Sequence, residues 1–281
     1  MDPAGDGLLV SRTEALTESH RHHSHVTAIH PLGLLAVEGG EDDRATVLAS
    51  LDRMQRLGTR NWVGYSFSWA ACLEARAGRA DGALRYLRAY LDAFILRNGF
   101  HANGDQTKSG LSNFTYRPFT LEGNFAAAQA VHEMLLQSWG GVLRVFPAVP
   151  AAWADVSFRD MRAEGGFAVS AERKAGTTTE VVVHAARAAS LTIRDPFAPG
   201  AGRWTIRRAG ATTAATVARP LRDDGGLLEF RLAQGDVLTG RAGARQGRNG
   251  LGDWGSILQS NREIEEIGKS INKSTTQGIT K

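Results

Sequence analysis

The stretch SWGGVLRVFPAVPAAW, residues 138–153, lies where the pattern of the sequence changes. Upstream of it, apolar residues recur every three or four positions, which predicts helices. Beyond Gly141, apolar and polar residues alternate, which predicts strands. We therefore expect a helical domain over residues 1–140 and a β domain over 141–246, joined by the proline-containing segment PAVPAAW.

The upstream half contains four segments with helical periodicity. One is EDDRATVLASLDRMQRLG, residues 41–58. Acidic residues are favoured at the start of a helix and glycine at its end, and this segment has both. Ser24 is a candidate N-cap for a further helix through HVTAIHPLGLL, residues 25–35. The remaining predicted helices are GYSFSWAACLEARAG (64–78), ADGALRYLRAYLDAFIL (80–96) and EGNFAAAQAVHEMLLQSWGG (122–141).

The downstream half contains short alternating segments separated by turn residues. Such a series predicts an antiparallel β domain, which we expect to be a β-sandwich. The predicted strands are VLRVFP (142–147), VSFRDMRA (156–163), GFAVSAER (166–173), TEVVVHAA (179–186), SLTIRD (190–195), RWTIRRAG (203–210) and LLEFRLA (227–233).

Residues 247–281 differ in composition from the rest of the chain. From Asn249 onward there is no alanine, but there are five isoleucines and three lysines; the first 246 residues contain only four isoleucines and two lysines. We expect a poorly ordered tail of separate origin. The competing interpretation is a docking helix, because Ile257, Ile264, Ile267 and Ile271 share one helical stripe.

Composition excludes several classes of protein. The formal charge is +4, and the arginines are scattered rather than clustered, so a nucleic-acid partner is not expected. No apolar run is long enough for a membrane span, and the first twenty residues lack the features of a signal peptide, which leaves the location of an intact parent open. Cys72 is the single cysteine and is expected to be a buried apolar residue.

The segment SHRHHSH, residues 19–25, holds four of the eight histidines. His22 and His25 are three positions apart, with no Cys or Asp close by, so we expect no metal site and no cofactor there. Imidazoles in the entry loop of a helix suit a hydroxyl-rich ligand. The alternative is a solvated or core-satisfied histidine run.

Three loops place polar and aromatic residues at helix ends. NWVGYSFSW provides Trp62 and Tyr65, and NGFHANGDQ provides His101 and Asp105, while Glu122 opens the segment LEGNF. Sugars require ring stacking together with dense hydrogen bonding, and glycoside hydrolysis requires two carboxyl groups. We therefore predict a carbohydrate site, with Glu122 and Asp105 as the candidate acids.

Each acid also has a structural interpretation. The carboxylate of Glu122 suits a helix N-terminus, where it could simply cap the helix. Asp105 could shape its loop through an Asx-turn in NGDQ.

Four ordered motifs resemble glycoside hydrolase family 95, whose characterised members include inverting 1,2-α-L-fucosidases and related α-L-galactosidases. The motifs are SHRHHSH with HPLG, GYSFSWAACLEARAG, LEGNFAAAQAVHEMLLQSWGG and FPAVPAAWADVSFRDMRAEGGFAVS. The resemblance extends from about Ser19 to Phe197. It implies an α+β multidomain protein in which this chain supplies the last part of an (α/α)6 barrel, followed by a β domain.

The resemblance also assigns residues. It implies substrate contacts for Arg21, His22 and His25, and Asn124 matches the family's pattern. At the position of Glu122 the fucosidases have an Asp, which helps an upstream Asn to activate water. The family's motif continues with a Gly after its Phe, and this sequence has Ala126 at that position.

The family's general acid and its water-activating Asn lie upstream of residue 1. The expected function is therefore that of the C-terminal portion of an inverting α-L-fucosidase-like hydrolase, inactive by itself and acting on a carbohydrate substrate. Open barrel edges would favour self-association.

Two alternatives remain. One is a carbohydrate-binding or structural helical module without catalysis. The other is a related (α/α)-barrel hydrolase or phosphorylase that acts on another sugar.

Overall fold

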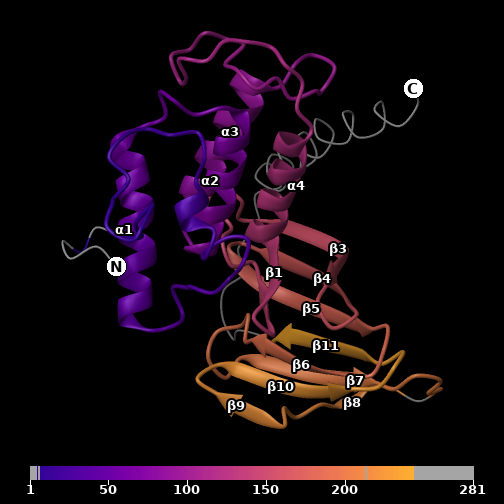
Figure 1. The fold of residues 1–281 in the computed structure, drawn as a ribbon. Coiled ribbons are helices and arrows are strands. Elements are labelled where there is room, and N and C mark those ends of the chain that lie inside the picture. The colour runs from indigo at the N-terminus through magenta and orange to yellow at the C-terminus, as the bar shows by residue number, and fades with distance from the viewer. Residues whose placement is uncertain (1–4, 6, 213, 244–281) are drawn as a thin grey trace. The chain divides into compact units, whose positions relative to one another are not determined.

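A computed structural model describes residues 5, 7–212 and 214–243 of the chain. The described chain divides into two compact units between Met134 and Leu135 (Figure 1). The tail predicted for residues 247–281 lies outside the described residues. No helix among the described residues is long and apolar enough to cross a membrane.

The first unit is helical. Its elements, among the described residues, are η1 (Ser24–Val26), α1 (Glu41–Leu57), α2 (Gly64–Arg76), α3 (Ala80–Phe94) and α4 (Glu122–Leu135), the last of which ends at the first residue of the second unit. The predictions for α1, α2 and α3 are confirmed to within two residues. The predicted helix over residues 25–35 is wrong, because a single 3-10 turn forms with His23 as its N-cap. Pro31 disfavours helical geometry at the residue before it.

Helices α2 and α3 form the centre of the first unit. They are joined by the three residues 77–79 and pack along aromatic side chains, with ring centroids 4.9 Å apart for Phe67 and Phe94. On α3, Leu84, Leu87 and Tyr90 are buried at helical spacing, so one face of the helix points into the core. Burial of such side chains contributes about 1.5–3 kcal/mol each and fixes the two helices against each other.

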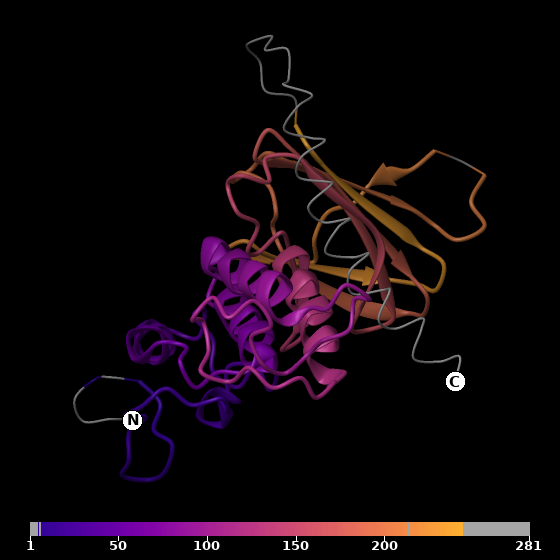
Figure 2. The ribbon, with the colours of Figure 1, turned by 90° about the horizontal axis from the view of Figure 1, so that it is seen from above.

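The second unit contains two sheets. Their strands are β1 (Leu136–Trp139), β2 (Val142–Val145), β3 (Val156–Ala163), β4 (Phe167–Lys174), β5 (Thr177–Ala185), β6 (Ala189–Arg194), β7 (Gly202–Arg207), β8 (Thr216–Val217), β9 (Arg222–Asp224), β10 (Leu227–Leu232) and β11 (Val237–Ala242). One sheet has the order β1-β2-β6-β10-β9, and the other has the order β3-β4-β5-β11-β7-β8. The strands can be followed in Figures 1 and 2.

The two sheets share one core. Trp204 of β7 and Phe230 of β10 belong to different sheets, and their ring centroids lie 5.2 Å apart. The seven predicted strands are confirmed, and the pairing is antiparallel except between β2 and β6, which pair in parallel through Val142 with Thr192 and Leu143 with Ile193. Sequence patterning missed β1, β8, β9 and β11.

The transition from α4 to β1 differs from the prediction. The expected helix continues to the glycine pair, but the structure ends it at Leu135 and begins β1 at Leu136. Gly140 and Gly141 have φ angles of 60° and 75°, and they connect β1 to β2 as a two-residue hairpin turn. The glycine pair is therefore a hairpin signal rather than a helix C-cap.

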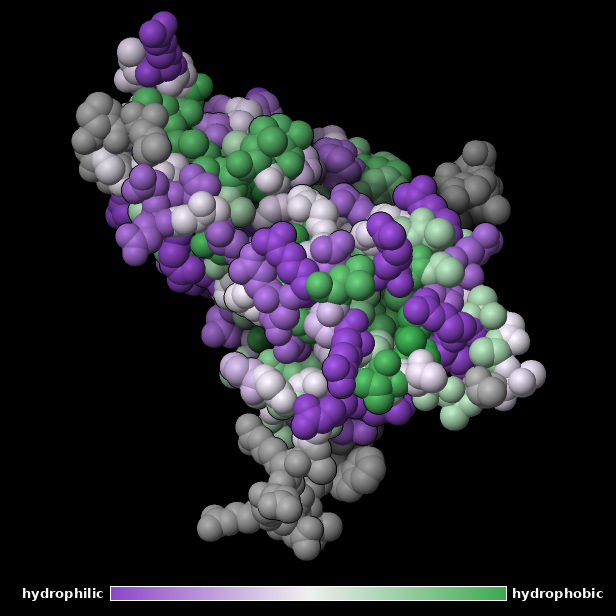
Figure 3. All heavy atoms as spheres, turned by 90° about the horizontal axis from the view of Figure 1, so that it is seen from below, coloured by the Kyte–Doolittle hydropathy of each residue, from purple (hydrophilic) through white to green (hydrophobic). Residues whose placement is uncertain are grey.

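Several large apolar side chains are exposed at the surface. Leu34 of the first unit and Val217 and Leu221 of the second are each more than two-thirds exposed. On the face drawn in Figure 3, hydrophobic and hydrophilic residues are interspersed.

Candidate functional site

The N-terminal ends of α2 and α4 lie together in the first unit. The Ser68 hydroxyl of α2 donates a hydrogen bond to the carbonyl of Gly123 in the first turn of α4, at 3.0 Å. One turn further along, the Cys72 thiol lies 3.5 Å from the carbonyl oxygen of Ala126. Cys72 is buried as expected. Two helix N-termini, each with a partial positive charge, are thus held side by side.

The imidazole of His101 lies between these two helix ends. A Cβ atom added to Gly64 or to Gly123 would overlap its ring, so both positions require glycine for close approach. Nδ1 lies 2.8 Å from both the carbonyl and the hydroxyl oxygen of Thr120. Burial lowers the pKa of His101, while the Thr120 carbonyl and the charge of Glu122 act in the opposite direction. The predicted substrate-binding residue His101 is thus fully buried between the helices.

Asn124 connects α4 to the loop that precedes it. Its side-chain oxygen accepts the backbone N–H of His101 at 3.1 Å, and its side-chain nitrogen donates to the carbonyl of Gly99 at 3.1 Å. The residue is 1% exposed. Its amide group therefore fixes the loop that carries His101.

Glu122 is the first residue of α4, and its side chain is exposed. Tyr65, in the first turn of α2, is half-buried, and its phenol pKa is raised by burial, by Cys72 and by the nearby charge of Glu122. Tyr65 also packs on Trp69, with ring centroids 5.7 Å apart. A solvent-facing carboxylate thus stands beside an aromatic pair of the neighbouring helix.

The segment SHRHHSH is anchored to the start of α2. The Ser66 hydroxyl donates to the carbonyl of Arg21 at 2.7 Å, and it also accepts the backbone N–H of Val63 at 3.2 Å. The side chains of Arg21 and His22 are exposed. The backbone of Arg21 is therefore held at the first turn of α2, the turn that also carries Tyr65.

Two other histidines of this segment, His23 and His25, are shielded from solvent to different degrees. His23 is 1% exposed and packs against the rings of Trp62 and Trp69, with centroids 4.6 and 5.6 Å away. Burial lowers its pKa to about 3, assisted by the neighbouring histidines. His25 is half-buried, and burial together with the charge of Arg53 lowers its pKa to about 4. Both imidazoles are neutral at pH 7.

Trp62 lies beneath the histidine segment. It is 2% exposed and contacts Phe67 and Tyr86, at centroid distances of 5.2 and 5.5 Å, in addition to His23. Its ring faces are thus covered by protein. Trp62 supports His23 from the core and presents no open ring face in the described chain.

Asp105 organises the loop that follows it. One carboxylate oxygen accepts the backbone N–H and the hydroxyl of Thr107, at 2.9 and 2.8 Å, and the other accepts the Ser109 hydroxyl at 2.9 Å. Burial opposes ionisation, but these hydrogen bonds outweigh it and hold the carboxyl pKa below its usual value. The geometry is that of the loop-shaping alternative, and the structure does not bring Asp105 to the surface beside Glu122.

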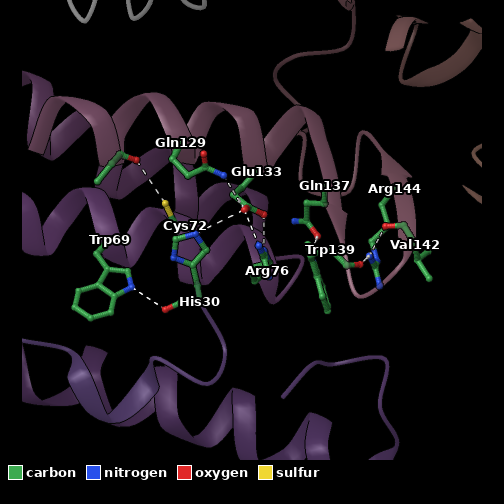
Figure 4. Close-up of polar contacts among 11 residues, drawn as sticks. His30, Trp69, Cys72, Arg76, Gln129, Glu133, Gln137, Trp139, Val142 and Arg144 are labelled. Carbon is green, nitrogen blue, oxygen red and sulfur yellow. Dashed lines mark hydrogen bonds and ion pairs between the residues drawn. The ribbon is translucent and has the colours of Figure 1, made fainter. Parts of the chain in front are cut away.

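A buried ion pair joins the C-terminal ends of α2 and α4 (Figure 4). Glu133 receives two hydrogen bonds from the guanidinium of Arg76, from Nε at 2.5 Å and from Nη2 at 2.8 Å. Gln129 donates to the same carboxylate at 2.9 Å, and His30 Nε2 lies 3.6 Å from it. Burial lowers the pKa of His30 to about 4, although Glu133 acts in the opposite direction. The helices are therefore fixed at both ends.

Sequence reasoning missed the residues that support this site. Ser66, Ser68 and Thr120 anchor the loops through side-chain hydroxyls, and Arg76 and Glu133 clamp the two helices. A charged residue on an otherwise apolar helix face, such as Glu133 within AVHEMLL, is the sequence signal that could have identified the clamp. No group of three or more His, Cys, Asp or Glu in the described ranges could hold a metal ion.

Chemically, the arrangement provides the exposed carboxylate of Glu122 near the phenol of Tyr65, and the segment anchored to α2 carries an exposed guanidinium and an exposed imidazole, those of Arg21 and His22. A carboxylate can accept a proton from water, while the other groups can donate hydrogen bonds to hydroxyls. The site thus combines a base with polar donors.

Comparison with known proteins identifies the family. Residues 10–135 match the model described as the glycosyl hydrolase family 95 catalytic domain, and residues 137–238 match the glycoside hydrolase family 95 C-terminal domain. The chain is 31% identical over 162 residues to alpha-L-fucosidase 2 of Arabidopsis thaliana, a match that covers 57% of this chain and 18% of that protein. It is 28% identical over 164 residues to a probable alpha-fucosidase A of Aspergillus oryzae, covering 53% and 22%.

The chain thus spans about a fifth of the length of these curated relatives. Among solved structures, a family 127 β-L-arabinofuranosidase from Geobacillus stearothermophilus matches 79% of this chain and 33% of its own, at 14% identity and a TM-score of 0.26. The two family models adjoin each other and together account for both described units, so the chain belongs to glycoside hydrolase family 95.

Proposed function

We propose that this chain is the C-terminal portion of an inverting glycoside hydrolase that cleaves an α-linked deoxyhexose or a related sugar. The observation that carries the proposal is the exposed carboxylate of Glu122 at the start of α4, beside the α2 turn that holds Arg21 and His22. The names of the two curated relatives, both fucosidases, support the sugar class.

In this proposal Glu122 orients or activates the attacking water. An inverting enzyme requires one carboxylate as general base and a separate general acid on the other side of the scissile bond. A carboxylate is a favourable group at the positive end of the α4 dipole. No covalent intermediate forms, because water itself attacks the anomeric carbon.

The remaining predicted residues divide into two groups by burial. Arg21, His22 and Tyr65 are solvent-accessible and would contact sugar hydroxyls or ring faces. His101 and Asn124 are buried and act as positioning residues, because they fix the loop and helix start from which Glu122 projects.

The other buried residues provide support. Trp62 holds His23, and Asp105 shapes the loop between α3 and α4. His25 is half-buried, and burial and the charge of Arg53 lower its pKa.

We further propose that the helices belong to an (α/α)6 barrel whose other helices lie outside this chain. The four α-helices of the described unit, followed along the chain by a β domain, are consistent with part of such a barrel. The general acid would come from that outside part, so this chain by itself would not hydrolyse glycosides.

The test is a chimaera in which residues 10–238 replace the matching region of the Arabidopsis relative. We expect the chimaera, but not this chain alone, to hydrolyse an aryl α-L-fucoside or α-L-galactoside with inversion at the anomeric carbon, observed by proton NMR. Glu122→Gln should abolish turnover and leave sugar binding nearly unchanged.

Two results would contradict the proposal. A folded chimaera without activity that still binds sugar would favour a carbohydrate-binding module. Turnover that requires added phosphate would favour a phosphorylase. Circular dichroism of the chimaera and of the Glu122→Gln variant provides the folding control.

A further inference from the structure

The β domain contains a cavity of about 540 Å³ that is lined by both of its sheets. Side chains of β8 and of the end of β7 come from one sheet, and side chains of β10 come from the other (Figure 1). Every lining residue belongs to the second unit, so the cavity uses none of the residues assigned to the sugar site.

The segment 218–221, which runs from β8 to β9, forms one wall of this cavity. At its start, the backbone N–H of Ala218 donates to the carbonyl of Trp204 on β7, at 2.8 Å. At its end, the backbone N–H of Leu221 donates to the carbonyl of Glu229 on β10, at 2.7 Å. The segment therefore bridges the two sheets and is fixed to both.

The lining of the cavity is mainly apolar. Ile206, Phe230 and Leu232 are 7%, 4% and 1% exposed and form its inner part, while Val217 and Leu221 are 77% and 67% exposed and also line it. Among the described residues of the second unit, Val217 and Leu221 are the large apolar side chains that are exposed. An apolar interior that continues into exposed apolar side chains is typical of a surface that a ligand or a partner covers.

The outer part of the cavity carries positive charge. Arg208, Arg219 and Arg231 line it, all three are exposed, and the described lining residues include no Asp or Glu. Arg208 pairs with Asp236 at 2.6 Å, whereas Arg219 and Arg231 form no ion pair within the described part of the chain. Two guanidinium groups thus stand beside an apolar cavity without a carboxylate to neutralise them.

A buried carboxylate holds the end of the cavity at Arg208 in shape. Asp236 is 1% exposed, and besides its bond to Arg208 it accepts the backbone N–H groups of Ala209 and Ala233, at 3.1 and 2.8 Å. These two alanines follow β7 and β10, one in each sheet. The ends of the two strands are therefore tied together, and a ligand would pay little conformational entropy to order this side of the cavity.

We propose that this cavity binds a small organic acid, with its carboxylate at Arg219 and Arg231 and its apolar body against Phe230 and Leu221. The planar fork of a guanidinium matches the two oxygens of a carboxylate, and such charge-assisted hydrogen bonds are among the strong ones in proteins. Apart from the arginines, Thr216 provides the one polar side chain among the described lining residues, so an uncharged sugar would find few hydrogen-bond partners. The lining thus favours an amphipathic anion.

The experiment measures dissociation constants for the full chain by ligand-observed NMR titration. Three probes separate the two parts of the ligand, because octanoate has a charge and an apolar chain, octanamide lacks the charge, and acetate lacks the chain. We expect octanoate to bind at least about tenfold more tightly than either of the others. Added salt should weaken the binding of octanoate and leave that of octanamide nearly unchanged.

Variants of the lining locate the site. Arg219→Gln and Arg231→Gln should each weaken octanoate binding about threefold to tenfold without changing octanamide binding. Leu221→Ser should weaken the binding of both probes, because it removes apolar surface. Arg207→Gln is the matched control, since Arg207 is an exposed residue of β7 that does not line the cavity. Circular dichroism provides the folding control for each variant.

Three results would overturn the proposed carboxylate site. One is an affinity for octanoate no higher than that for octanamide or for acetate. Another is a pair of folded arginine variants that bind octanoate like the original chain. Gel filtration examines the competing occupant, a second copy of the chain. If Leu221→Ser abolishes dimerisation and leaves octanoate binding unchanged, the exposed apolar side chains serve self-association instead.

Discussion

Removal of one charge from the Arg76–Glu133 pair tests whether this ion pair stabilises the packing of α2 against α4. Glu133→Gln preserves the size of the side chain but removes the carboxylate at the C-terminal ends of α2 and α4 (Figure 4). In the structure this residue is 3% exposed, and its carboxylate accepts hydrogen bonds from Nε and Nη2 of Arg76 and from Gln129. The amide of the variant would direct N–H groups at donors, and the buried guanidinium of Arg76 would lose the negative charge of Glu133.

The expected cost follows from burial. Breaking a buried ion pair by removal of one partner typically destabilises a protein by about 3–5 kcal/mol. For a unit of this size, such a loss lowers the melting temperature by roughly 10 °C. Arg79 and Asp52 form a matched control pair at 2.6 Å, whose side chains are 28% and 48% exposed. Asp52→Asn should therefore change stability by about 1 kcal/mol or less.

The assay is urea denaturation followed by far-ultraviolet circular dichroism, which reports mainly on the helices. Glu133→Gln should lower the denaturation midpoint well below that of Asp52→Asn. The double variant Arg76→Met/Glu133→Leu should recover most of the loss, because both charges of the pair are then removed together. If Glu133→Gln is no more destabilising than Asp52→Asn, the pair does not clamp the helices and the reasoning is refuted.

Three further predictions concern the loops around the site. Burial holds the pKa of His23 at about 3, below the unfolded value of 6.5, so the unfolded chain binds more protons than the folded chain between these pH values. The free energy of unfolding should therefore fall as the pH is lowered through this window, and it should fall less in His23→Asn. Urea titrations at a series of pH values measure the difference. Asp105→Ala removes three accepted hydrogen bonds and should lower stability by about 2–3 kcal/mol in thermal denaturation, whereas an unchanged melting temperature would exclude its loop-shaping role. Gly123→Ala places a methyl group against the ring of His101 and should cost about 1–3 kcal/mol, with a displaced His101 signal in NMR spectra; an unshifted signal would contradict the close approach.

Periodicity predicts the fold where one face of an element is apolar. Helices α1 to α3 and seven strands follow from such patterns, since burial on one side imposes a period of 3.6 or 2 on the sequence. The end of α4 is harder to predict, because the apolar residues of LLQSW fit a helical repeat as well as a strand repeat. Only the turn at Gly140 and Gly141 shows that a hairpin begins. Strands β8 and β9 have two and three residues, too few for a period to be visible.

The candidate site is only partly visible in the sequence. The motif residues identify the segments that come together, because the histidine run, the start of α2 and the start of α4 are linked in the structure. Which side chains face solvent depends on packing between distant segments. Trp62 and His101 have the residue types of a sugar site, yet both are buried by aromatic and helical neighbours. The carboxylates also differ, since Glu122 projects to the surface and Asp105 is enclosed by its own loop.

The most direct test of the proposed hydrolase is the turnover of α-L-fucosides by the chimaera that carries residues 10–238, compared with its Glu122→Gln and Glu122→Asp variants. We predict inversion of configuration in the chimaera, loss of turnover in Glu122→Gln with sugar binding retained, and an altered rate or sugar preference in Glu122→Asp, because a carboxylate shifted by one methylene holds water differently. Full activity of a folded Glu122→Gln chimaera would contradict the assignment of Glu122 as the residue that positions water.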